Sequence, residues 1–290
     1  MADHAIEKDY GHKPVLLQEC LDALAIRPDG VYVDGTLGRA GHSLEIVRRL
    51  TEGGRLIGID RDQTAIDAAQ ERLAPYLDRV TLVHSNFDRV GDILADLHIS
   101  GVDGMLFDLG VSSPQLDDAA RGFSYMHDAP LDMRMDRTAP LTARDVVNDW
   151  PYEELRRILY DFGEERCAPA IARRIVQARQ QAPMETTLQL VDIIKSAMPP
   201  AALREKQHPA KRSFQAIRIA VNGELDALPP MLEAAVSHLN AGGRLAVISF
   251  HSLEDRIIKK TMQELATGCT CPPNFPVCVC GKTPKIRLVS

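Results

Sequence analysis

Residues 31–42, with the sequence Val31-Tyr-Val-Asp-Gly-Thr-Leu-Gly-Arg-Ala-Gly-His42, decide the fold that this chain predicts. A short apolar run ends in the carboxylate Asp34 and continues into a loop with glycine at every third position, at 35, 38 and 41. Glycines in such a loop let the backbone turn tightly and approach a ligand, as in the first loop of nucleotide-binding folds. The apolar residues of 43–50 then recur at helical spacing. We therefore expect a strand, a ligand-binding loop and a helix in succession.

Outward from this stretch, strand and helix patterns alternate through residue 116. Strands are expected at residues 31–34, 55–60, 80–83 and 104–108, and helices at residues 43–50, 65–73 and 90–97. The alternation resumes after Glu224, with a helix at 231–239, a turn at 241–244, a strand at 245–250 and a last strand at 285–290. Such alternation predicts a parallel sheet that is covered by helices on both faces.

The intervening residues 116–215 have no convincing strand pattern and carry three apolar stripes at helical spacing. The predicted fold class is therefore α/β, with a Rossmann-like sheet and an inserted, mostly helical second domain. We expect residues 1–117 and 216–290 to form the discontinuous sheet domain and residues 118–215 to form the insertion. A chain of 290 residues is long enough for two such cores.

Charge and hydropathy exclude several classes of protein. The chain carries 34 Lys and Arg against 40 Asp and Glu, and this net charge of −6 argues against a nonspecific nucleic-acid coat protein. No apolar run approaches the ~18 residues of a membrane helix, and residues 1–10 have no secretory signal pattern. We expect a cytoplasmic protein with no membrane partner.

One stretch, residues 204–218, is locally basic. It contains Arg204, Lys206, Lys211, Arg212 and Arg218 against a single acidic residue, Glu205. Such a run is either a solvated helix face or a surface that contacts nucleic acid, and the pattern alone leaves both interpretations open.

The carboxylates at the strand ends indicate the class of ligand. Asp60 ends the second strand, 26 residues after Asp34, at the position that binds ribose hydroxyls in dinucleotide folds. The loop lacks the G-x-G-x-x-G spacing of a pyrophosphate site, and Asp34 would repel a phosphate. A cationic ligand without phosphate, such as S-adenosylmethionine, is therefore favoured over a nicotinamide cofactor. Phe87 follows the third strand, as an apolar wall for adenine or as an ordinary core residue.

Residues 108–115, Asp108-Leu-Gly-Val-Ser-Ser-Pro-Gln115, follow the fourth strand at the carboxyl edge, where open sheets bind ligands. We expect Asp108, Ser112 and Ser113 to accept hydrogen bonds from a substrate amine, although the same residues suit a helix cap. His251 follows the fifth strand and would lie at the same edge, but a lone histidine is more often structural.

Five motifs stand in order along the chain: Asp34-Gly-Thr-Leu-Gly-Arg-Ala-Gly-His42-Ser43, Asp108-Leu-Gly-Val-Ser-Ser-Pro-Gln-Leu-Asp117, Pro130-Leu-Asp-Met-Arg-Met-Asp136, His208-Pro-Ala-Lys-Arg-Ser-Phe-Gln-Ala-Ile-Arg218 and Ile248-Ser-Phe-His-Ser-Leu-Glu-Asp-Arg256. With His12-Lys-Pro-Val15, they resemble the bacterial ribosomal small-subunit RNA cytosine-N4 methyltransferases from about residue 10 onward. The resemblance implies a class I methyltransferase sheet, S-adenosylmethionine as methyl donor, and a cytidine in the decoding region of 16S rRNA as acceptor. It also implies that the insertion recognises RNA.

The resemblance further implies that cofactor contacts fall on Ala40, Gly41, His42, Asp60, Phe87, Asp108 and Gln115, in addition to Asp34 and Gly38 of the loop. Ala40 replaces a glycine of many relatives, and we expect a negative φ there because a side chain is present. Relatives usually continue with a basic, Glu-rich tail beyond the position of Ser290, so either this is a shortened form or its affinity for RNA is reduced.

The substrate base needs an aromatic surface, and the candidates are Phe123, Tyr125 and Phe250. Lys211 and Arg212, with Arg218, are expected to contact RNA. A DNA amino-methyltransferase and a non-enzymatic rRNA-binding assembly factor remain alternative functions, and the sequence leaves open whether the chain is a monomer or a homodimer.

Four of the six cysteines lie within twelve residues, as Cys269-Thr-Cys271 and Cys278-Val-Cys280. Two pairs of thiolates can close a tetrahedral zinc site, whereas the alternative is free thiols in a proline-rich loop. The resemblance favours a structural role, because only some members carry these cysteines. No residue is assigned as a metal ligand at this stage.

Overall fold

The computed structural model describes residues 14–272 and 277–289. Its elements in chain order are α1 (Leu17–Leu24), β1 (Val31–Asp34), α2 (Gly41–Val47), β2 (Arg55–Asp60), α3 (Gln63–Arg72), η1 (Ala74–Tyr76), β3 (Val80–His84), η2 (Phe87–Arg89), α4 (Val90–Asp96), β4 (Val102–Asp108), α5 (Ser113–Asp117), η3 (Ala119–Arg121), α6 (Ala143–Asp149), α7 (Tyr152–Asp161), α8 (Ala168–Arg179), α9 (Thr187–Ala197), α10 (Pro200–Leu203), α11 (Lys211–Asn222), α12 (Leu228–His238), β5 (Leu239–Ile248) and α13 (Ser252–Ala266). None of the helices in the described ranges has the length and apolar character needed to cross a membrane.

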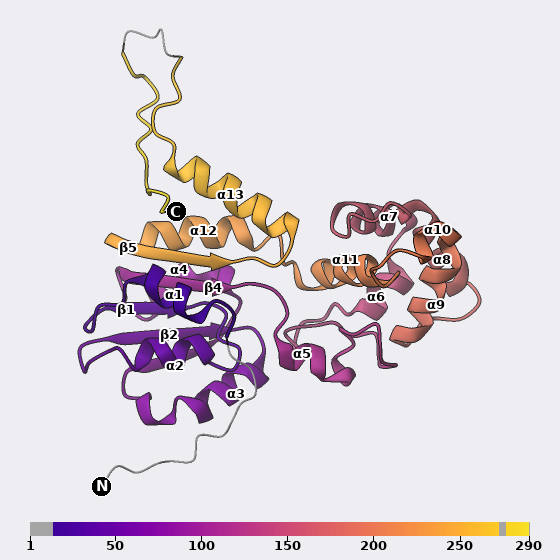
Figure 1. The fold of residues 1–290 in the computed structure, drawn as a ribbon, viewed down its shortest axis with the longest axis horizontal. Helices are drawn as coiled ribbons and strands as arrows, with labels where there is room; N and C mark the ends of the chain where they lie inside the picture. The colour runs from indigo at the N-terminus through magenta and orange to yellow at the C-terminus, as the bar shows by residue number, and fades with distance from the viewer. Residues whose placement is uncertain (1–13, 273–276, 290) are drawn as a thin grey trace.

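The five strands form one parallel sheet in the order β3-β2-β1-β4-β5, with the helical part of the chain to one side (Figure 1). Successive side chains of a strand point to opposite faces. Val33 and Phe107 therefore pack against α4 and α12 on one face, while Tyr32 and Leu106 pack against α1 and α2 on the other. A parallel sheet that is buried on both faces explains the nearly continuous apolar strands of this sequence.

Most of the predicted strands are confirmed, and two predictions at the end of the sheet are wrong. β5 begins at Leu239, and the expected turn at 241–244 lies inside it as an irregularity, where the register with β4 shifts and Gly242 has φ +81°. The predicted last strand is absent over residues 285–289, which are described. The Lys285 amide donates to the Leu265 carbonyl at 2.8 Å, so this segment contacts the end of α13 instead of a sheet edge.

The helical part has its own apolar core, built from α6 to α9 and α11. Within residues 116–215, all of which are described, β pairing is limited to the isolated bridge between Pro130 and Thr186. α11 connects the two parts, because Phe214 and Ile217 pack in the helical core whereas Ile219 packs beneath the sheet. The expected boundary between residues 215 and 216 thus falls within this helix.

Candidate active site

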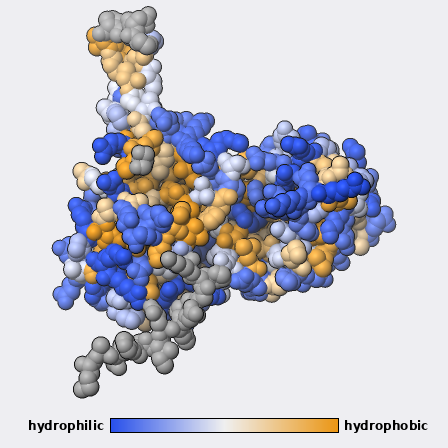
Figure 2. Space-filling view, viewed as in Figure 1, coloured by the Kyte–Doolittle hydropathy of each residue, from blue (hydrophilic) through white to orange (hydrophobic). Residues whose placement is uncertain are grey.

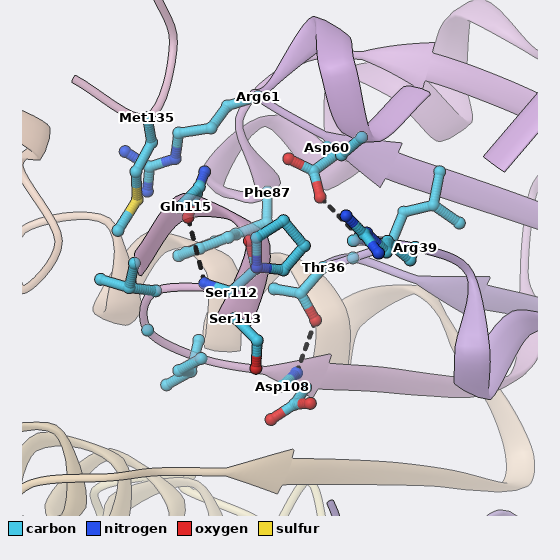
Figure 3. A pocket seen from close by; sticks show the side chains of 18 of the residues that line it. Thr36, Arg39, Asp60, Arg61, Phe87, Asp108, Ser112, Ser113, Gln115 and Met135 are labelled. Carbon is cyan, nitrogen blue, oxygen red and sulfur yellow. Dashed lines mark hydrogen bonds between the residues drawn. The ribbon is translucent and has the colours of Figure 1, made fainter. Parts of the chain in front are cut away.

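A cavity of about 430 Å³ lies at the carboxyl ends of β1, β2 and β4. The sheet order places β1 between β2 and β4, so the chain changes direction across the sheet at this point, and open α/β sheets bind ligands in the crevice that results. Figure 3 shows side chains from the loop after β1, the end of β2 and the segment after β4 converging on this space. The structure therefore places the predicted motifs around one cavity.

The glycine loop is tied to the strands on both sides of β1. The Gly38 amide donates to Asp60 Oδ2 at 2.8 Å, and the Gly35 amide donates to the Leu106 carbonyl at 2.9 Å. Gly38 has φ +50°, which glycine adopts readily. A Cβ atom on Gly35 would lie 2.2 Å from the Phe107 ring, so the backbone packs there in the absence of a side chain.

The expectation that Ala40 has a negative φ is wrong, because the structure gives φ +56°. This conformation costs a residue with a side chain about 1–2 kcal/mol. The loop imposes it, because the Ala40 amide donates to the Leu37 carbonyl at 2.7 Å and the Ala40 carbonyl accepts from the Leu44 amide at 3.0 Å. The methyl group is fully buried, which offsets part of the strain. A glycine at this position would adopt the same backbone without strain.

Asp34 is buried and supports the loop from below. Its Oδ2 accepts from the Ser43 hydroxyl at 2.7 Å and its Oδ1 from the Thr36 amide at 3.3 Å, while burial raises its pKa. Asp34 and Ala40 are not among the described residues that line the cavity, whereas the other seven predicted cofactor residues are. The carboxylate that was expected to face a cationic ligand therefore stabilises the turn that forms the wall.

Asp60 connects the glycine loop to the residues after β2. Besides Gly38, its carboxylate accepts from the Asp62 amide at 2.9 Å, and burial raises its pKa to about 6 despite these two donors. Each carboxylate oxygen retains a second lone pair, and the side chain lines the cavity. Asp60 can thus accept a hydrogen bond from a ligand hydroxyl, as the sequence predicts.

Phe87 forms an apolar part of the wall next to Asp60. The side chain is buried, packs edge-on against Phe107 at 6.0 Å between ring centroids, and lies under the Arg61 guanidinium at 5.6 Å. The ring is therefore a core residue that also lines the cavity, and its role as a wall for adenine stays a prediction.

Asp108 lies at the end of β4 with one carboxylate oxygen unused. Its amide donates to the Thr36 hydroxyl at 2.6 Å, and its Oδ2 lies 3.9 Å from His42 Nδ1. Oδ1 is buried and has no hydrogen-bond partner among the described residues. Burial raises the pKa of Asp108 to about 6, with Asp34 acting in the same direction and His42 opposing it. The cavity thus contains a carboxylate that can accept both a hydrogen bond and a proton.

The segment after β4 combines a helix cap with a buried polar network. The Ser112 amide donates to Gln115 Oε1 at 3.1 Å, so this part of the motif does cap α5. Gln115 Nε2 donates to Asp62 Oδ2 at 2.9 Å, and Arg121 Nη1 donates to the same oxygen at 2.8 Å. Ser112 and Ser113 also line the cavity, so the alternatives of cap and site are not exclusive.

Several cavity residues were missed by sequence reasoning. Thr36, Arg61, Met135, Glu224 and Glu254 all line the space. Arg61 directly follows Asp60 and its Nη1 donates to the Asn222 carbonyl at 2.7 Å, so it joins the end of β2 to the end of α11. Thr36 and Arg61 could have been found because they are neighbours of predicted site residues in the sequence. Met135 and Glu224 reach the cavity only through tertiary packing.

The structure separates the remaining candidates. His251 is the N-cap of α13, with its Nε2 3.2 Å from Glu254 Oε1, and is not among the described lining residues. Phe123 is buried in the helical core, and Tyr125 stacks on His208 at 4.5 Å between ring centroids. Phe250, in contrast, is 57% exposed and lines the cavity.

The basic residues of 204–218 also divide into two groups. Arg218 forms a bidentate pair with Glu224 at 2.8 and 2.9 Å and is therefore part of the fold. Arg212 lies 3.8 Å from Glu205. Arg204, Lys206 and Lys211 are exposed and form no ion pair with any residue in the described ranges.

Comparison with known proteins decides the family. Residues 9–290 match the MraW methylase family. The chain belongs to the MraW methylase family. It is similar to ribosomal RNA small subunit methyltransferase H of Symbiobacterium thermophilum, with 60% identity over 97% of this chain and 88% of that protein. The corresponding proteins of Brevibacillus brevis and a Paenibacillus species are 57% and 58% identical over 97% of this chain and over 90% and 91% of their own lengths.

A MraW methylase takes its methyl group from S-adenosylmethionine, and the cavity residues fit this group. Asp60 offers carboxylate lone pairs for ribose hydroxyls, Phe87 offers an apolar wall for adenine, and the unpartnered Oδ1 of Asp108 lies at the same sheet edge. When bound, S-adenosylmethionine supplies a methyl group on a positively charged sulfur. The negative side chains of this methylase suit that charge.

The Asp62–Arg121 pair should be a main determinant of stability in this methylase. Both side chains are buried, so Arg121→Ala leaves an uncompensated carboxylate and is expected to cost about 3–5 kcal/mol in the free energy of unfolding. Urea denaturation followed by circular dichroism measures this loss. The exposed pair of Arg89 and Asp92 is the control, and Arg89→Ala should leave the midpoint unchanged. Equal midpoints for the two variants would contradict the assignment.

Proposed function

We propose that this MraW methylase methylates the exocyclic N4 of a cytidine in the decoding region of 16S rRNA, in the small ribosomal subunit. The names of its relatives support a small-subunit rRNA substrate. The observation that carries the choice of an amine is Asp108, which lines the cavity and whose buried Oδ1 lacks a partner among the described residues. A free carboxylate oxygen is the acceptor that an amine N–H requires.

Phe250 supplies the second requirement of such a site, a surface for the base. Its ring is exposed, lines the cavity, and would lie 3.6 Å from a Cβ atom on Gly110, so it stands next to the segment that follows Asp108. A base that is taken out of an RNA stack is held by aromatic stacking together with hydrogen bonds to its polar edge. Phe250 provides the aromatic surface, and Asp108 provides a hydrogen-bond acceptor.

The chemistry requires a proton acceptor, because the lone pair of the N4 amine is delocalised into the cytosine ring. In the transfer, nitrogen bonds to the methyl carbon, the carbon–sulfur bond breaks, and one N–H proton leaves. The Asp108 carboxylate accepts a hydrogen bond from the amine, stabilises the charge that develops on nitrogen and takes that proton. Its pKa of about 6 keeps it ionised at neutral pH and basic enough for this role.

For the helical part we propose a role in RNA recognition. Lys206 and Lys211 are exposed on it, and α11 runs from Lys211 to Asn222, just before the cavity residue Glu224. A helix of twelve residues spans about 18 Å. Folded RNA that fills the cavity is long enough to reach the lysines at the other end of this helix, where they would meet phosphates.

The test of the proposal uses radiolabelled S-adenosylmethionine with unmethylated small ribosomal subunits, naked 16S rRNA and duplex DNA, each digested to nucleosides. Label in N4-methylcytidine from subunits or rRNA is the expected result. Label in DNA alone would identify a DNA amino-methyltransferase. Donor binding without any transfer would identify a non-enzymatic rRNA-binding factor, and either outcome overturns the proposal.

Activity should depend on pH through Asp108. Because the carboxylate form is the acceptor and its pKa is raised to about 6, kcat should fall as the pH drops through about 6 and level off above it. Asp108→Asn keeps the shape but removes the base, so turnover should fall on the order of 10²–10⁴-fold and the inflection should disappear. Calorimetry of donor binding to the variant is the control, and turnover above about a tenth of wild type would refute the role.

Phe250→Ala should weaken the binding of substrate without weakening that of the donor. Base stacking is worth about 1–3 kcal/mol, so KM for the subunit should rise about five- to hundredfold. Phe250→Trp, which keeps an aromatic face, is the matched control and should retain the wild-type KM. A parallel loss of donor affinity in Phe250→Ala would assign the ring to the donor site instead.

Reversal of the two free lysines, Lys206→Glu with Lys211→Glu, should weaken subunit binding and reduce its dependence on salt concentration. Each lost phosphate contact lowers the slope of log affinity against log salt by about one. Filter binding over a salt series measures both quantities. Arg89→Glu, a reversal on the sheet domain, is the control, and an equal effect of the two changes would mean a general charge effect and not a contact surface.

A further inference from the structure

A cluster of four cysteines lies outside the catalytic cavity, in the C-terminal arm, by which we mean the described residues 267–272 and 277–289 after α13. Cys269 and Cys271 lie in the first of these two segments, and Cys278 and Cys280 lie in the second. Their four Sγ atoms all lie within 4.8 Å of one another. Two of the separations are 3.5 Å, between Cys278 and Cys280, and 3.7 Å, between Cys269 and Cys280.

These separations match a tetrahedral metal site better than disulfides. With Zn–S bonds of about 2.3 Å, the sulfur atoms of a tetrahedral Zn–S₄ centre lie about 3.8 Å apart. A disulfide needs about 2.05 Å between its sulfur atoms and joins them only in pairs. In this cluster Cys280 approaches sulfur atoms from both pairs, so all four thiols face a common centre.

Backbone amides around the cluster donate hydrogen bonds to its sulfur atoms. The Cys271 amide donates to Cys269 Sγ at 3.4 Å. The amides of Lys282 and Thr270 donate to Cys280. Amide donors to the sulfur atoms also form the outer shell that orients ligands in protein metal sites.

The arm has little else to hold it in shape. Figure 1 shows it projecting from the end of α13 and returning to the body of the molecule, and Figure 2 shows hydrophobic residues along its described part. Val277 and Val279 are 70% and 74% exposed, so they pack into no core. At the base, the Lys285 amide donates to the Leu265 carbonyl. A segment without a core usually needs a metal or disulfide to keep one conformation.

We propose that Cys269, Cys271, Cys278 and Cys280 bind one structural Zn²⁺ ion that joins the two sides of the C-terminal arm. All four positions of the ion are filled by cysteine sulfur, so the site is closed and takes no part in methyl transfer. Binding displaces the thiol protons to solvent and changes no oxidation state. The ion holds the two sides of the arm together across residues 272–277, and with them Lys282 just beyond the cluster.

Metal analysis of the purified chain tests the proposal. After incubation with zinc chloride under reducing conditions and extensive dialysis, we expect about one zinc ion per chain by mass spectrometry of the metal. Replacement by cobalt should produce the intense visible absorption of tetrahedral cobalt thiolate. The double change Cys278→Ser with Cys280→Ser should remove both signals, whereas Cys167→Ser, outside the cluster, should keep them. Thermal unfolding of the double variant should match wild type, because the cysteines of the arm lie outside the apolar cores.

Limited trypsin digestion provides a second readout that does not depend on activity. Cleavage after Lys282 should be at least about tenfold faster in the chelator-treated chain and in the double variant, because loss of the metal opens the arm. Absence of bound zinc in the wild-type chain, or disulfide-linked cysteines in the chain isolated without reductant, overturns the proposal. Zinc that persists in the double variant, or equal cleavage rates with and without chelator, does the same.

Discussion

The hydrogen bonds of the Asp62 carboxylate join the two parts of the molecule. Asp62 follows β2, caps α3 through the Thr64 amide, and accepts from Gln115 of α5 and from Arg121 of η3. A buried carboxylate is costly unless every lone pair is used, and here donors from three segments meet that requirement. Burial alone would raise the pKa of Asp62, but these hydrogen bonds lower it below its ordinary value. The ion pair thus fixes the entry of the helical part relative to the sheet, and with it the cavity between them.

Three carboxylates end adjacent strands, and their surroundings assign them different tasks. Asp34 is enclosed and holds the loop, Asp60 accepts a backbone amide on each oxygen while its side chain lines the cavity, and Asp108 has one oxygen without a partner among the described residues. The parallel register brings their positions to one edge, since Asp34 pairs with Gly58 on one side and Leu106 on the other. Burial then raises the pKa of all three. The hydrogen bonds that each carboxylate accepts from the described residues, and not the type of residue, distinguish the three positions.

Charge along the sequence was a weaker guide than the motifs. Residues 204–218 form a basic run. Within it, Arg218 forms an ion pair with Glu224 at the junction of the two parts, where α11 meets the cavity. Of its other basic residues, Arg212 lies 3.8 Å from Glu205, and Arg204, Lys206 and Lys211 form no ion pair within the described part of the chain. The type of residue was also a weak guide to the aromatic surface of the site. Phe123 and Tyr125 pack in the helical core, and of the three candidates Phe250 alone lines the cavity.

By itself the sequence determined the α/β class, four of the five strands nearly to their ends, the helical insertion, and the two segments after β1 and β4 that form a large part of the cavity wall. It did so because apolar periodicity and glycine spacing are local properties that the backbone obeys directly. Tertiary structure decided the rest. The backbone of Ala40 is left-handed because the loop between Leu37 and Leu44 demands it, and the turn expected near Gly242 is absorbed into β5 by pairing with β4. Met135 and Glu224 reach the cavity only when distant segments pack together, and no local pattern encodes such contacts. The spacing of the four cysteines left zinc binding and free thiols both open, and the structure places their sulfur atoms within 4.8 Å of one another.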